Sequence, residues 1–235
     1  MSELKPFIPQ KGISGSALKI IAIFAMLLDH IGAVFLRAYT GPYLIFRSIG
    51  RIAFPIFCFL LAEGFFHTKN IAKYCFRLGI FALISEIPFD LAFSRTVYDP
   101  DSQNVFFTLL IGLVTIACMD LCKNIPAGSP GIWLLCFGSL PAAGMALAWL
   151  LNTDYAEIGV LSVVLLYLFH NKRTISVVCV CLALCCLSEL ELAAFAAVPL
   201  ILYYNGRRGI ALKYIFYIFY PAHLLVLFLL DAYLL

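Results

Sequence analysis

The chain has 235 residues, of which 63% are hydrophobic and only 12% are charged, with a net charge of +3 at pH 7. A soluble globular domain is about 45–50% apolar and about 25% charged, so the composition excludes an ordinary soluble domain and predicts an all-α, polytopic membrane protein. The apolar runs are long and continuous, which is not typical of a transmembrane barrel. The small net charge gives no reason to expect a nucleic-acid partner.

The apolar runs predict nine membrane-spanning segments of about 20 residues, the sixth to eighth being shorter. No connection is long enough for a soluble domain, since the longest runs from Arg95 to Gln103. We therefore expect one integral-membrane domain over residues 1–235, with spans at roughly 16–37, 43–66, 71–94, 104–122, 131–151, 155–170, 174–188, 192–205 and 213–234.

Lysines and arginines are concentrated in alternate connecting segments, counted from the N-terminus, whereas most acidic residues lie in the other segments. The positive-inside rule therefore predicts a cytoplasmic N-terminus and, after nine spans, an external C-terminus. The basic residues on the predicted cytoplasmic side are Lys5, Lys11, Lys19, Lys69, Lys73, Arg77, Lys123, Lys172, Arg173, Arg207, Arg208 and Lys213.

The first span, LKIIAIFAMLLDHIGAV, carries Lys19 near its start and Asp29 and His30 in its outer half. An ionisable side chain inside a membrane costs roughly 2.5–3.5 kcal/mol even on mild scales, so we expect this pair to face the protein interior. The His30 imidazole could act as a general base, or could only tie helices together. Asp29 could fix the tautomer of His30. Because adjacent helical side chains point about 100° apart, Asp29 could instead pair with an arginine of the second span.

Further polar residues interrupt the next spans. Arg47 and Arg51 lie one helical turn apart in the second span, and Glu86 and Asp90 are spaced in the same way in the third. Because buried charges need partners, these four residues predict an internal ion-pair network, which could be a scaffold or part of an acceptor-binding site. Additional polar positions are Glu63, Asn104 and, in the last span, His223.

Lys69, Lys73 and Arg77 are spaced i, i+4, i+8 at the start of the third span. On one helix face they could bind phosphate groups, or they could contact anionic lipid headgroups. Gly50, Gly64 and Gly79 could permit close helix packing. Nucleophile motifs, phosphate-binding loops and metal-ligand spacings are absent from the sequence, so no metal is expected.

Five blocks of the sequence together resemble the TraX family. They are LKIIAIFAMLLDHIGAV, GRIAFPIFCFLLAEGFFHTKN, YCFRLGIFALISEIPFDLAF, NVFFTLLIGL and YIFYIFYPAHLLVL. The first span is also similar to that of the wider membrane acyltransferase superfamily, in which a basic residue, usually Arg, precedes a histidine by eleven positions. Lys19 and His30 match that spacing.

The resemblance implies a bacterial cytoplasmic-membrane acyltransferase that passes acetyl from cytoplasmic acetyl-CoA to an acceptor at the outer face. The acceptor would be the pilin N-terminal amine or a peptide or glycan amine or hydroxyl. His30 would be a base or acyl carrier. The other expected roles are orientation or charge stabilisation (Asp29, Arg51), acceptor binding (Arg47, Glu63, Glu86, Asp90, Asn104) and contact with the CoA phosphates (Lys19, Lys69, Lys73, Arg77).

Two other functions fit the same residues. Intramembrane Asp, Glu, His and Arg also mark proton pathways, so a proton-coupled transporter or channel is the main alternative. We see no internal repeat between the halves of the sequence, which many transporters have. A non-enzymatic assembly protein is the third possibility.

Overall fold

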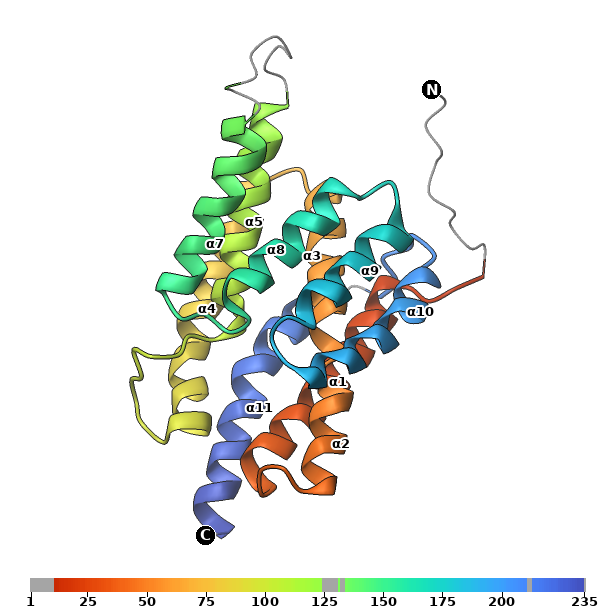
Figure 1. The fold of residues 1–235 in the computed structure, drawn as a ribbon. Helices are drawn as coiled ribbons and strands as arrows, with labels where there is room; N and C mark the ends of the chain where they lie inside the picture. The colour runs from red at the N-terminus through yellow and green to blue at the C-terminus, as the bar shows by residue number, and fades with distance from the viewer. Residues whose placement is uncertain (1–10, 124–130, 132–133, 211–212, 235) are drawn as a thin grey trace.

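The computed structural model describes residues 11–123, 131, 134–210 and 213–234, and every element assigned there is helical, as predicted (Figure 1). The elements, in chain order, are α1 (Gly15–Phe35), α2 (Gly41–Gly50), α3 (Ala53–His67), α4 (Ile71–Ser94), α5 (Val105–Cys122), η1 (Leu135–Ser139), α7 (Leu140–Leu150), α8 (Ala156–Leu168), α9 (Arg173–Leu184), η2 (Glu189–Ala196), α10 (Ala197–Leu202) and α11 (Lys213–Leu234).

Four segments of the described chain are long and apolar enough to cross a membrane: Gly15–Phe35, Gly41–His67, Val105–Cys122 and Tyr214–Tyr233. Three further apolar helices are shorter, and α8, with 13 residues, extends about 20 Å at 1.5 Å per residue. This is less than the roughly 30 Å of a bilayer core. The apolar helices are those of a membrane protein, whereas nine complete spans and their orientation stay predictions.

The predicted segments match helices closely, but three of them are divided. The second segment (43–66) consists of α2 and α3, the eighth (192–205) consists of η2 and α10, and the described part of the fifth (131–151) contains η1 and α7. Proline explains the first two divisions, because it removes the hydrogen bond to the carbonyl four residues earlier and clashes with that carbonyl. Pro55 acts in this way on Arg51, between α2 and α3, and Pro199 acts on Phe195, at the end of η2. Part of the fifth segment lies outside the described residues.

Helix α3 lies in the middle of the bundle and contacts α1, α5, α8, α9 and α10 (Figure 1). On one side, α1 packs against α2 and α11, and α4 packs between α11 and α5. The core between α1 and α3 contains the fully buried Leu18, Ala22 and Ile56. Lipid tails are as apolar as these side chains, so helix association in a membrane depends on close packing and polar contacts more than on hydrophobic burial.

Two glycines allow α1 and α2 to approach each other closely. A Cβ at position 50 would overlap the side chain of Asp29, and a Cβ on Gly32 would lie 2.7 Å from the Phe46 Cβ. Gly50 therefore makes room for a carboxylate between the two helices, which confirms the predicted packing role of this glycine.

We predict that Gly50→Ala destabilises the protein by about 1–3 kcal/mol, because the added methyl group overpacks a tight contact and displaces Asp29. The measurement is the thermal unfolding midpoint of the purified protein in detergent. Gly41→Ala is the matched control, since a Cβ there meets nothing within 4 Å. Equal midpoints for the two variants would contradict the packing argument.

Candidate functional site

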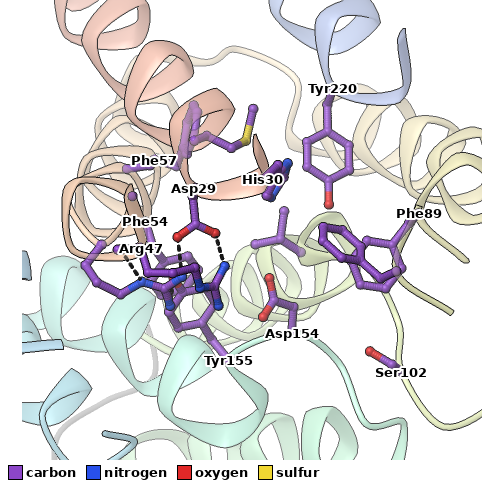
Figure 2. A pocket seen from close by; sticks show the side chains of 16 residues that line it. Asp29, His30, Arg47, Phe54, Phe57, Phe89, Ser102, Asp154, Tyr155 and Tyr220 are labelled. Carbon is purple, nitrogen blue, oxygen red and sulfur yellow. Dashed lines mark hydrogen bonds and ion pairs between the residues drawn. The ribbon is translucent and has the colours of Figure 1, made fainter. Parts of the chain in front are cut away.

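A cavity of about 240 Å³ lies among α1, the α2–α3 junction, α4, α11 and the turn that precedes α8 (Figure 2). Its walls combine aromatic rings with ionisable groups, although much of the surrounding helix surface is apolar. The lining residues are Met26, Asp29, His30, Arg47, Gly50, Arg51, Ala53, Phe54, Phe57, Phe89, Phe93, Ser102, Val105, Asp154, Tyr155 and Tyr220.

Asp29 forms ion pairs with two arginines. Arg47 lies in α2, and Arg51 caps the C-terminus of that helix. Its Oδ1 accepts a hydrogen bond from Arg51 Nη2 at 2.6 Å, and its Oδ2 accepts one from Arg47 Nη1. The carboxylate is buried, with 6% of the residue exposed. The structure therefore confirms the predicted pairing of Asp29 with arginines of the second span.

Arg51 connects this pair to the C-terminal half of the chain. Its Nη1 donates to Glu191 Oε1 at 2.8 Å and to the Tyr155 hydroxyl at 3.2 Å. Glu191, on η2, is 1% exposed, and the Tyr155 ring stacks on Phe54 at 3.7 Å. One guanidinium thus joins α1, α2, η2 and the turn before α8.

His30 contacts another histidine instead of Asp29. Its Nδ1 lies 2.7 Å from Nε2 of His223 on α11. The rings of Phe93 and Tyr220 are steeply inclined to that of His30, at centroid distances of 5.3 and 6.1 Å. In the described part of the chain, the other ring nitrogen of His30, Nε2, has no hydrogen bond, and His30 lines the cavity.

Asp154 and Tyr220 point into the same space as His30 (Figure 2). The backbone holds Asp154 in place, since its N–H donates to the Gln103 carbonyl at 2.8 Å and its carbonyl accepts a hydrogen bond from the Thr108 hydroxyl. The next residue, Tyr155, has a φ of 62°, in the left-handed region that is uncommon for residues other than glycine. Such strained turns are concentrated at functional sites.

The predicted ion pairing of Arg47 and Arg51 with Glu86 and Asp90 is wrong. Among the described residues, the arginines pair with Asp29 and Glu191. Asp29 is closer because Gly50 lets α1 approach α2, and it therefore supplies the charge that the arginines need.

Glu86, Asp90 and Asn104 hold the connection between α4 and α5 and do not line the cavity. Asn104 caps α5, accepting from Phe106 N, and its side chain donates to Glu86 and to the Ala82 carbonyl. The Asp90 carboxylate accepts from Asp99 N at 3.0 Å. Hydrogen bonds from the Ser94 hydroxyl and the Asp101 N–H lower the pKa of Asp99. These residues place Ser102 at the cavity wall, and acceptor binding by them stays a prediction.

Glu63, expected among the acceptor-binding residues, lies in a separate polar cluster away from the cavity. Its Oε1 is 3.2 Å from His170 Nε2, beside a void of about 10 Å³ that Arg173 and Ser176 also line. This cluster shares no lining residue with the main cavity. The structure therefore gives Glu63 no contact with the candidate site.

A second polar region surrounds Lys19, near the start of α1. Lys19 lies within electrostatic range of Arg77 on α4 and Arg208 in the connection before α11. The backbone positions Arg208, because its carbonyl accepts a hydrogen bond from Ser16 N at 3.0 Å. No carboxylate of the described residues forms an ion pair with these three side chains, and Arg77 Nε is buried without a hydrogen-bond partner.

Aromatic rings accompany these cations. Lys19 Nζ lies 5.3 Å from the centroid of Phe216, and the Arg77 guanidinium lies 5.3 Å from Tyr217 and 5.1 Å from Tyr74. We call Lys19, Arg77 and Arg208 the cation cluster.

The prediction that Lys69, Lys73 and Arg77 share one face of a helix is wrong for Lys69. Helix α4 begins at Ile71 with Asn70 as its cap, so Lys69 precedes the helix. The other lysine, Lys73, is exposed.

Sequence reasoning gave no role to Glu191, Asp154, His223 or Arg208. The first two were counted only as charges of external connections. His223 was a polar residue inside an apolar span, the same signal that singled out His30, and Arg208 was counted only in the topology.

The fold and the site define a class: an all-helical membrane protein with an ionisable cavity built largely from apolar helices. A comparison with protein families identifies the particular member of that class. The family model described as "TraX protein" matches residues 14–231, and the chain belongs to the TraX family.

Two relatives are informative. The chain is 29% identical to a probable fimbrial assembly protein FimC, serogroup H1, of Dichelobacter nodosus, over 91% of this chain and 94% of the relative. It is 32% identical to an uncharacterised protein of Rickettsia prowazekii (strain Madrid E), over 40% of this chain and 33% of that protein. No solved structure matches the chain significantly.

We predict that Arg51→Gln destabilises the protein by about 3–5 kcal/mol, because it leaves the buried Glu191 without a cation and Asp29 with only one. The measurement is again the thermal unfolding midpoint in detergent. Lys123→Gln is the control, since it breaks an ion pair with Asp120 in which both side chains are more than 40% exposed and which contributes about 0–1 kcal/mol. Shifts of equal size would contradict the role of Arg51.

Proposed function

We propose that the protein is a membrane acetyltransferase that moves the acetyl group of acetyl-CoA to an amine or hydroxyl acceptor, with His30 as the general base. The observation that carries the proposal is an imidazole inside an apolar bundle, lining a cavity, with Nε2 free of hydrogen bonds among the described residues. A group in that state can accept a proton. Membership of the TraX family supports the same reaction class through the resemblance described above.

The proposed reaction is a direct transfer. The acceptor nitrogen or oxygen attacks the thioester carbonyl carbon while His30 Nε2 takes its proton. The C–S bond then breaks, and the departing thiolate takes the proton from the His30 imidazolium, which gives acetylated acceptor and CoA. The Tyr220 hydroxyl, which lines the same cavity, is placed to donate a hydrogen bond to the developing oxyanion.

The donor would bind with its phosphates at the cation cluster. These three cations have no carboxylate partner among the described residues, and one of them has a buried N–H without a hydrogen bond there, so they suit a polyanion. The neighbouring aromatic rings offer faces for the adenine base. Lys19 and His30 are eleven residues apart on α1, or about 16 Å along the helix, a separation that the pantetheine arm can bridge.

This arrangement fits the predicted orientation, with Lys19 near the cytoplasmic face of the bacterial inner membrane and the cavity toward the outer face. The acceptor would then be extracytoplasmic. The name of the Dichelobacter relative, a probable fimbrial assembly protein, supports a pilin N-terminal amine as the first acceptor to test, beside amines or hydroxyls of cell-surface glycans.

We predict that His30→Ala binds acetyl-CoA as the wild type does but transfers acetyl about 10²–10⁴-fold more slowly, because the general base is lost. The measurements are binding of acetyl-CoA and its turnover, with and without acceptor amines, by protein in detergent. His67→Ala is the control, since His67 is exposed and lies outside the cavity. If wild-type protein fails to bind acetyl-CoA, the proposal is wrong and proton flux in liposomes becomes the next measurement.

We also predict that Arg77→Gln and Lys19→Gln each weaken CoA binding about 10- to 100-fold, since each removes a charge-assisted contact worth about 1.5–3 kcal/mol. Equilibrium binding of CoA measures the effect. Lys73→Gln is the matched control, because it removes the same charge from an exposed side chain about one turn before Arg77. A larger loss in Lys73→Gln than in Arg77→Gln would contradict the assignment of the cation cluster.

A further inference from the structure

The contact between His30 and His223 has the geometry of an in-plane hydrogen bond. The two rings are nearly parallel, at 7°, with centroids 5.0 Å apart, while the facing nitrogens are only 2.7 Å apart. This centroid distance equals the nitrogen–nitrogen distance plus the two ring radii. The rings therefore meet edge to edge in one plane, and one nitrogen donates directly to the other.

The partners of His223 decide which nitrogen donates. His223 Nδ1 lies 2.8 Å from the Phe219 carbonyl, and a carbonyl oxygen can only accept, so His223 Nδ1 carries a hydrogen. In neutral imidazole the other nitrogen is then an acceptor. His223 Nε2 therefore accepts from His30 Nδ1, which leaves the lone pair of His30 on Nε2.

The surroundings hold His223 in this orientation. The side chain is buried, with 7% of the residue exposed. Its ring lies nearly parallel to the Phe219 ring, with a centroid distance of 4.8 Å, and Tyr220 packs against it edge-on at 5.5 Å. Since the accepting carbonyl belongs to the same helix, one turn earlier, α11 itself sets the direction of the chain of hydrogen bonds.

From this geometry we propose that His223 is a positioning residue that fixes His30 in the tautomer with the hydrogen on Nδ1 and the lone pair on Nε2. The inference rests on the proposed function, in which Nε2 receives the proton of the acceptor. When Nε2 takes that proton, His30 becomes an imidazolium whose Nδ1–H still donates to His223. His223 itself neither gains nor loses a proton, and the same proton leaves Nε2 for the CoA thiolate.

The activity test uses a pair of substitutions at His223. His223→Phe keeps an aromatic ring but removes the acceptor, so we expect kcat to fall about 100-fold or more with little change in the KM for acetyl-CoA. His223→Gln places an amide oxygen near the position of Nε2, and we expect it to retain activity within about threefold of wild type. An equal loss in both variants, or no loss in His223→Phe, would overturn the inference.

His67→Gln is the matched control. The His67 Nδ1 makes the same bond to a carbonyl four residues earlier, that of Glu63, at 2.8 Å, but the side chain is exposed and does not line the cavity. We expect it to behave as wild type. Loss of activity in this control would show that breaking such a bond is damaging anywhere in the protein.

A spectroscopic test does not depend on activity. In protein with ¹⁵N-labelled histidine, protonated and bare ring nitrogens give separate signals, and the chain has only four histidines, so His30→Ala identifies the signals of His30. We expect His30 to carry its hydrogen on Nδ1 in the wild type and in His223→Gln, and to redistribute it toward Nε2 in His223→Phe. A hydrogen on Nε2 in the wild type, or an unchanged tautomer in His223→Phe, would overturn the inference.

The two tests separate this inference from the proposed function. If the tautomers are as expected but the wild type transfers no acetyl, the role of His223 in orienting His30 stands and the acetyltransferase proposal is refuted. If the wild type transfers acetyl but the rate does not depend on the His30 tautomer, the acetyltransferase proposal stands and the role of His223 is refuted.

Discussion

The ion pair between Asp29 and Arg51 is the interaction on which the arrangement of the bundle depends. Moving either charge out of water costs several kcal/mol, and only well-placed partners offset that cost. The guanidinium of Arg51 also contacts Glu191 and Tyr155, so one side chain fixes the relative positions of segments more than 100 residues apart in the chain. Gly50 is required next to it, because any side chain there would occupy the space of the Asp29 carboxylate. The break between α2 and α3, caused by Pro55, places Arg51 where it can contact all of these partners.

Within this frame, some polar groups of the described residues have all their hydrogen-bond partners and others do not. Buried polar groups are normally hydrogen-bonded, and the two oxygens of Asp29 follow the rule. His30 uses only one of its two ring nitrogens in the described structure. At the cation cluster the imbalance is one of charge, since the three cations have no carboxylate partner in the described part of the chain. Other buried polar atoms of the described residues also lack a partner, among them Glu191 Oε2 and Asp90 Oδ1. His30 and the cation cluster are the two unsatisfied features to which the proposed function assigns a ligand.

The helices could be predicted from the sequence because hydropathy is a local property, and α4 agrees with its predicted bounds at both ends. The pairing of Asp29 with an arginine could be predicted because both lie at a similar depth in consecutive spans. Partners from distant segments could not: Glu191 is 140 residues from Arg51, and His223 is 193 residues from His30. Glu86 and Asp90 were predicted as partners of the arginines from depth alone, but depth does not show that one oxygen of each carboxylate is bonded to Asn104 or to the Asp99 backbone. The break near Pro55 that divides α2 from α3 was not predicted from the sequence.

The position of the two histidines in the chain has a consequence for biogenesis. His30 lies on α1 and His223 on α11, 193 residues later, and the backbone of Ile13 also bonds to Tyr203 and Asn205. A ribosome that has synthesised His30 must add a further 193 residues before His223 exists to meet it. Until then, the imidazole of His30 has no partner on Nδ1, and its tautomer is free to vary. The contact between His30 and His223 is therefore absent from any nascent chain that has not yet reached α11, and such a chain cannot carry out chemistry that depends on this contact.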